Sequence, residues 1–75
     1  MPKFYFHVRE DKVLFVDKRG GNFPDVKSAW EWAHSDAKAM LDEGHFNSPA
    51  ERLWVEIEDA GGTLLATLPF ARVVN

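Results

Sequence analysis

Residues 25–44, DVKSAWEWAHSDAKAMLDEG, decide how this chain of 75 residues is organised. Apolar side chains recur there at the 3.6-residue period of an α-helix, with charged and polar side chains on the other side. Asp25 stands where an N-cap carboxylate accepts the first free amides, and Gly44 is a natural stop. A competing capping box runs from Ser28 to Glu31, but a start there leaves Val26 outside the stripe. The stretch predicts one amphipathic helix whose apolar stripe is Val26, Ala29, Trp30, Ala33, Ala37, Met40 and Leu41.

Trp32 does not fit this stripe. It lies about 120° or more from the stripe centre at roughly 100° per residue, beside Asp36 and Glu43. One interpretation places its ring over the helix flank or under the chain termini, because tryptophan is well buried on average. The other makes Trp32 an exposed anchor for a partner, because tryptophan is over-represented at interface hot spots.

Alternating apolar and polar residues predict two strands before the helix and two after it. The second strand is apolar on both parities, so the pattern leaves open which of its faces is buried. Asp59 to Gly62 is a strong turn signal, whereas the turn at Glu10–Asp11 has no glycine. Ser48 and Pro49 are expected to start a single helical turn, and Phe70 and Val73 to fold back over the core. The predicted strands are residues 3–9, 12–17, 53–59 and 63–68, and residues 18–22 are predicted to form a loop.

Hairpin, helix and hairpin make an α+β fold, β-β-α-β-β, with a four-stranded antiparallel sheet. A single helix covers only one face of such a sheet. We predict the strand order 2-1-3-4, which is antiparallel throughout and pairs opposite charges across the first and third strands. This order places Tyr5, His7 and Arg9 opposite Trp54, Glu56 and Glu58 on the uncovered face of the sheet.

Composition restricts the class of protein further. The chain is 45% hydrophobic with three tryptophans and six phenylalanines, and its length suits one domain, residues 1–75. The absence of cysteine excludes a disulfide-rich secreted protein and a thiolate site. The first residues lack a continuous apolar segment, and no run reaches transmembrane length, so a cytoplasmic protein without a membrane partner is expected.

The ends of the chain carry a resemblance to a known family. The chain resembles a group of short alpha-proteobacterial proteins classed only as a domain of unknown function. The family usually has Asp-Gly where this chain has Glu10-Asp11. The resemblance implies the fold class and no activity. Its motifs here are Tyr5-Phe6-His7-Val8-Arg9, Pro24-Asp25, the alanines from Ala29 to Ala37, Val55 to Asp59, Gly62 and Leu68-Pro69-Phe70.

No group of residues forms a recognised catalytic or metal-binding motif. We therefore expect that the protein is not an enzyme and binds no metal and no cofactor. His7 is isolated from any nucleophile, and a cross-strand hydrogen bond, for example to Glu56, is its expected role. His34 and His45 are eleven residues apart, which is not metal-ligand spacing on one helix. The basic glycine segment at residues 18–21 lacks the length and the Lys-Ser/Thr of a P-loop.

Two functions from different classes follow from the uncovered face. The first is a non-catalytic protein-interaction module that forms a homo-oligomer or binds another protein, because uncovered apolar area usually marks a partner. The second is a single-stranded nucleic-acid binder that stacks bases on Tyr5 and Trp54. The net charge of −3 disfavours the second. The expected interaction face comprises Tyr5, His7, Arg9, Trp54, Glu56 and Trp32.

Overall fold

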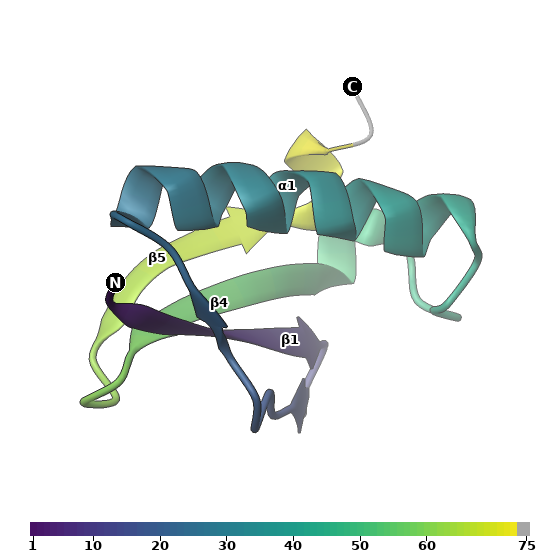
Figure 1. The fold of residues 1–75 in the computed structure, drawn as a ribbon. Coiled ribbons are helices and arrows are strands. Elements are labelled where there is room, and N and C mark those ends of the chain that lie inside the picture. The colour runs from purple at the N-terminus through teal and green to yellow at the C-terminus, as the bar shows by residue number, and fades with distance from the viewer. Residues whose placement is uncertain (74–75) are drawn as a thin grey trace.

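The computed structural model describes residues 1–73 and shows one helix lying across an antiparallel sheet (Figure 1). The sheet order is β2-β1-β4-β5, and the short β3 pairs with the start of β1. This confirms the predicted α+β class and the strand order. The elements are β1 (Lys3–Glu10), β2 (Val13–Phe15), β3 (Gly21–Asn22), α1 (Val26–Asp42), β4 (Leu53–Asp59) and β5 (Leu64–Pro69), with short 3-10 turns at Ala50–Arg52 and Phe70–Arg72.

Both ends of α1 are set by the residues that the sequence indicates. The Asp25 carboxylate accepts the Ser28 amide at 2.8 Å, so the helix starts at Asp25 and not at the competing capping box. At the other end Gly44 adopts a φ of 71°, which glycine takes at little cost. The Gly44 and His45 amides donate to the Leu41 and Met40 carbonyls, as in a Schellman motif.

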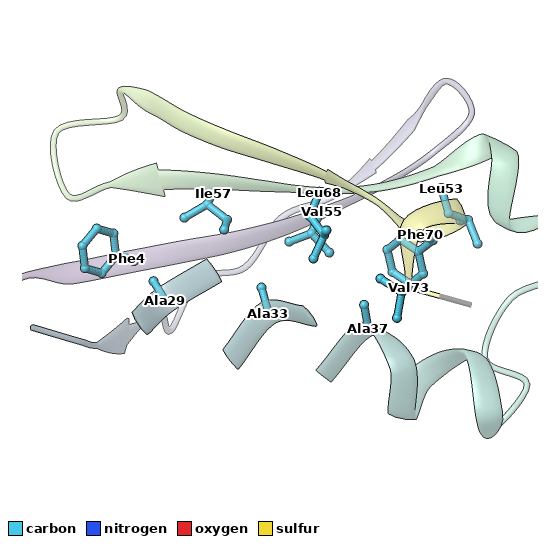
Figure 2. Close-up of a cluster of buried hydrophobic side chains, with 10 residues drawn as sticks. All are labelled: Phe4, Ala29, Ala33, Ala37, Leu53, Val55, Ile57, Leu68, Phe70 and Val73. Carbon is cyan, nitrogen blue, oxygen red and sulfur yellow. The ribbon is translucent and has the colours of Figure 1, made fainter. Parts of the chain in front are cut away.

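Three alanines of α1 form its contact with the sheet. Ala29, Ala33 and Ala37 are buried, and Figure 2 shows them pointing from the helix toward the buried side chains of the strands. Their small size lets the helix approach the sheet closely. Val26, at the edge of the predicted stripe, is exposed instead. The remaining core residues are Phe4, Leu53, Val55, Ile57, Leu68, Phe70 and Val73, so the predicted return of Phe70 and Val73 over the core is confirmed.

The segment between β1 and α1 departs most from the prediction. The second strand covers only Val13–Phe15, and its three side chains are exposed, so it buries neither face. Gly21–Asn22, predicted as loop, pairs with Lys3–Phe4. Gly20 makes this possible, because it has a φ of 69° and a side chain there would lie 2.7 Å from the Phe4 carbonyl oxygen.

Smaller differences concern the turns. The turn after β1 falls at Asp11 and Lys12, one residue later than expected, and Asp11 has a φ of 55°. Asp11 therefore takes the left-handed conformation that the glycine of the resembling family would adopt freely. The expected Ser48 cap is not formed: Pro49 precedes the 3-10 turn, which has no side-chain cap. Pro69 belongs to β5, where it pairs with Trp54 at the sheet edge.

Candidate functional site

The uncovered face of the sheet carries the side chains that the sequence places there. In the β1–β4 register Tyr5 pairs with Glu58, His7 with Glu56 and Arg9 with Trp54. Side chains alternate between the two faces of a strand, and Phe4 is buried against α1. Tyr5, His7 and Arg9 therefore point to the other side, where no helix within residues 1–73 lies over the sheet (Figure 1).

His7 is the most buried polar side chain of this face, with 7% of its surface exposed. Its Nδ1 accepts a hydrogen bond from the Asp17 amide at 2.9 Å, and its Nε2 lies 3.1 Å from Glu58 Oε1. Because a backbone amide only donates, Nδ1 carries no proton in this arrangement, and Nε2–H donates to Glu58. The cross-strand hydrogen bond of His7 is present, but its partner is the diagonal neighbour Glu58 and not Glu56. The Tyr5 ring stacks on the imidazole with centroids 6.4 Å apart.

The charges on this face are neutralised within the face. Arg9 Nε lies 2.6 Å from Glu56 Oε2, and this hydrogen bond, together with the carboxylate charge, raises the pKa of Arg9. The Lys3 ammonium lies 5.8 Å from the centre of the Tyr5 ring on the same face. Lys3 and Arg9 balance Glu56 and Glu58, so the formal charges of the face sum to zero.

The Asp17 side chain links β1 to the loop that follows Asp17. Its carboxylate accepts the Phe6 amide at 3.1 Å, the Arg19 amide at 3.0 Å and the Gly20 amide at 3.1 Å. Burial alone would raise the pKa of Asp17, but these amides outweigh it and the pKa lies below its usual value. The carboxylate fills the gap that β2 and β3 leave along the edge of β1. This role of Asp17 was not predicted from the sequence, although an aspartate before a glycine loop is a signal for an Asx turn.

On the helix side a pocket of about 520 Å³ opens between α1, β1 and the segment that carries β3. Three aromatic rings meet there: Phe6 and Trp32 have centroids 4.9 Å apart, and Phe23 lies 5.6 Å from Phe6 and 5.8 Å from Trp32. Trp32 lies over the helix flank with 45% of its surface exposed. The pocket lining consists of Phe6, Val8, Asp17, Arg19, Gly20, Gly21, Phe23, Trp32, Asp36 and Met40.

The expected interaction face is therefore divided between two sides of the molecule. Tyr5, His7, Arg9, Trp54 and Glu56 share the uncovered face, whereas Trp32 contacts Phe6, which points to the helix side. The pocket was not predicted from the sequence. The signal for it was the i, i+4 spacing of Trp32, Asp36 and Met40 on one flank of the predicted helix.

The other histidines have local partners. His34 lies against Trp30 with ring centroids 5.5 Å apart, and His45 Nε2 lies 3.0 Å from Glu43 Oε1. Within residues 1–73 no three histidine, aspartate or glutamate side chains are grouped in a way that would hold a metal ion. The basic glycine segment has a structural role. Its amides donate hydrogen bonds to the Asp17 carboxylate, and its end forms β3.

The fold and the two surfaces define a small α+β domain with one sheet face covered by a helix and the other uncovered. The chain belongs to the family described as domain of unknown function DUF6894, which matches residues 3–71. This confirms the family resemblance drawn from the sequence motifs. No match was found among curated proteins or among solved structures. No helix in the described part of the chain is both long and apolar enough to cross a membrane.

Proposed function

We propose that this protein is a non-catalytic interaction module that self-associates, with two copies meeting through their uncovered sheet faces. The observation that carries the proposal is a row of side chains across all four main strands. Leu14 pairs with Arg9, Arg9 with Trp54, and Trp54 with Pro69. The row is apolar apart from Arg9, whose charge is already paired with Glu56. Such a row favours burial against another surface.

The charge balance of the face supports a second copy as the partner. In a twofold dimer the same patch contributes both sides of the interface. A patch with net charge would then meet its own charge, whereas this face has two cations and two carboxylates. Leu64 and Leu65 lie where the register shifts beside Glu58, and both are exposed, so apolar area continues at this end of the sheet.

The size of the molecule is compatible with this arrangement. A stable interface buries about 800 Å² on each partner. The described chain exposes 4943 Å², so such an interface would take about one sixth of its surface.

Light scattering on a sizing column across a dilution series tests the proposal. We expect a dimer, and we expect Trp54→Glu to give a monomer, because the new carboxylate would be buried at the centre of the interface. Trp54 is only half-buried and lies on the uncovered face, so the variant should still fold. Trp32→Glu makes the same exchange on the helix side and should remain a dimer. A monomeric parent protein, or dissociation by Trp32→Glu alone, would refute the proposal.

A single-stranded nucleic-acid binder is the second candidate. Tyr5 and Trp54 are only half-buried on the uncovered face, and Lys3 and Arg9 are near them. Two features weigh against it: Tyr5 already stacks on His7, and the carboxylates of Glu56 and Glu58 lie on the same face as the aromatic rings. Unchanged tryptophan fluorescence on addition of an oligonucleotide at low salt would eliminate this candidate.

We also propose that the protein acts in the cytoplasm, where its cysteine-free composition is ordinary. Fractionation of cells expressing the chain with a tag at either end tests this location. Recovery with the membrane or secreted fraction would contradict it.

A further inference from the structure

The pocket on the helix side has the size and lining of a small-molecule site. Its volume of about 520 Å³ lies within the range of about 300 to 1,000 Å³ that such sites occupy. Trp32, Asp36 and Met40 follow one another at i, i+4 spacing and form one wall along α1. Phe6 and Val8 of β1 form the opposite wall. The lining is thus apolar and aromatic apart from a few polar groups.

Asp36 is the unusual member of this lining. It stands one turn after Trp32 and one turn before Met40, so its carboxylate lies along an apolar wall. Within residues 1–73 its carboxylate has no hydrogen bond and no ion pair, and its oxygens reach solvent. Burial raises the pKa of Asp36, the nearby Glu43 raises it further, and His45 opposes this effect. Partial burial disfavours the ionised form of this carboxylate, and a cation placed beside it would favour that form.

Among the charged groups of the pocket, Asp36 is the carboxylate that can bind a cation. The Asp17 carboxylate is already bound by the amides of Phe6, Arg19 and Gly20. The Arg19 side chain also lines the pocket and contributes one positive charge. Two carboxylates against one guanidinium give the lining a net charge of −1.

Trp32 supplies a second feature that favours a cation. Its indole packs against Phe6 and Phe23 and still exposes 45% of its surface. The electron-rich face of an indole attracts ammonium groups more strongly than other aromatic rings do. Trp32 and Asp36 lie one turn apart on the same wall, so one cationic group can contact both.

We propose that this pocket binds a small organic cation, with an ammonium group between Trp32 and Asp36 and an apolar body against Phe6, Val8 and Met40. Charge complementarity selects the class: an acidic carboxylate and an aromatic face stand at one end of an apolar cavity. The site lies on the opposite side of the sheet from the proposed dimer interface, so either proposal can fail without the other.

Titration of the ¹⁵N-labelled protein with benzyltrimethylammonium chloride, followed by NMR, tests this site. We expect saturable shifts at the Trp32 indole and at the Phe23 and Asp36 amides, with the Trp54 indole unchanged. Benzyl alcohol and benzenesulfonate have similar rings without the positive charge and should bind about five- to tenfold more weakly or not at all. Shifts confined to Trp54, an absence of saturable shifts, or equal binding of the alcohol would overturn the proposal.

Two variants with the same change in net charge separate the site from general electrostatics. Asp36→Asn should weaken binding of the probe about five- to tenfold, because it removes the counter-charge while keeping the side-chain shape. Glu31→Gln removes one negative charge from an exposed position of the same helix and should leave binding unchanged. Arg19→Gln should strengthen binding, since it removes the one cation of the lining. Equal effects of Asp36→Asn and Glu31→Gln would refute the site.

Discussion

The two faces of β1 show how differently one strand can be used. Toward the helix it presents Phe4, Phe6 and Val8, and toward the other side it presents Tyr5, His7 and Arg9. The first set is held by burial of apolar area. In the second set His7 and Arg9 bind carboxylates of β4, and the Tyr5 ring stacks on His7. The strand alternation is the same for both, so the difference comes from what covers each face.

The helix side is itself uneven. Above β4 and β5 the helix closes the core completely, and Ile57 and Leu68 have no exposed surface. Toward β2 the same side opens, because Phe6 and Val8 are half-buried and Phe15 is 51% exposed. Figure 1 shows α1 lying over β4 and β5, with β1 and β2 farther from it. One helix covers only part of its side of a sheet of this width. The part of the helix side that α1 leaves open forms the pocket.

The largest effect should come from the closed part of the core. Ile57→Ala should destabilise the fold by about 2 to 5 kcal/mol, because it leaves a cavity in a fully buried position. Leu64→Ala, at a position that is 53% exposed, should cost less than about 1 kcal/mol. Urea unfolding followed by circular dichroism measures both. Similar losses would mean that the two positions do not differ in packing as described.

His7 tests whether the uncovered face contributes through its hydrogen bonds. His7→Phe should cost about 1 to 3 kcal/mol, because the Asp17 amide and Glu58 lose their partner in a half-buried place. Glu58→Gln keeps an acceptor for Nε2–H and should cost clearly less. If His7→Phe is neutral in urea unfolding, packing on this face matters more than its polar network.

The pH dependence of stability tests Asp17, which connects the two faces. Its pKa is lowered in the folded state, so the ionised form stabilises the fold above the ordinary pKa of about 3.9. That stabilisation is lost as the pH falls through the folded-state pKa. Asp17→Asn should cost about 1 kcal/mol at neutral pH, since the side-chain amide cannot accept both sets of amide protons.

The variant Asp17→Asn should also flatten the acid limb of the stability curve. Asp25 has a lowered pKa of the same sign, so the limb should be reduced and not abolished. Asp25→Asn should reduce the remainder of the limb while keeping the helix cap, because asparagine caps a helix as well as aspartate. Urea midpoints between acid and neutral pH measure both variants. An unchanged acid limb in Asp17→Asn would contradict the role of its carboxylate.

The smallest effect concerns the turn that carries the exposed strand β2. Asp11→Gly should stabilise the protein by about 0.5 to 1 kcal/mol, because glycine adopts a φ of 55° without steric cost. Lys12→Gly, at the neighbouring turn position, where φ is not positive, should not stabilise it. The shift of the thermal midpoint measures the difference. Destabilisation by Asp11→Gly would indicate that the aspartate side chain supports the turn.

Predictions from the sequence were correct for features that depend on interactions between residues close together in the chain. Asp25 and Gly44 mark the ends of α1 because capping involves residues within one turn. Strand alternation placed Tyr5, His7 and Arg9 together because it needs only the period of two. The strand order followed from pairing opposite charges across β1 and β4, and the structure has that order.

The candidate site was predicted only in part, because long-range contacts decide the rest. The partner of His7 depends on which diagonal neighbour its ring reaches, and Glu58 is the one within hydrogen-bond distance. Trp32 had two open interpretations, and contact with Phe6 and Phe23 places it on the helix side. Neither contact is visible in a pattern of neighbouring residues.

The sequence alone determined the helix, its caps, the alternation of the strands and the family, since each rests on local spacing or on short motifs. The tertiary structure decided that Asp17 bridges the gap along β1, that Gly21–Asn22 adds a strand, and that the helix leaves a pocket beside Trp32. Those features arise where segments distant in the chain meet. Their geometry depends on how far one helix extends over the sheet, which no local pattern specifies.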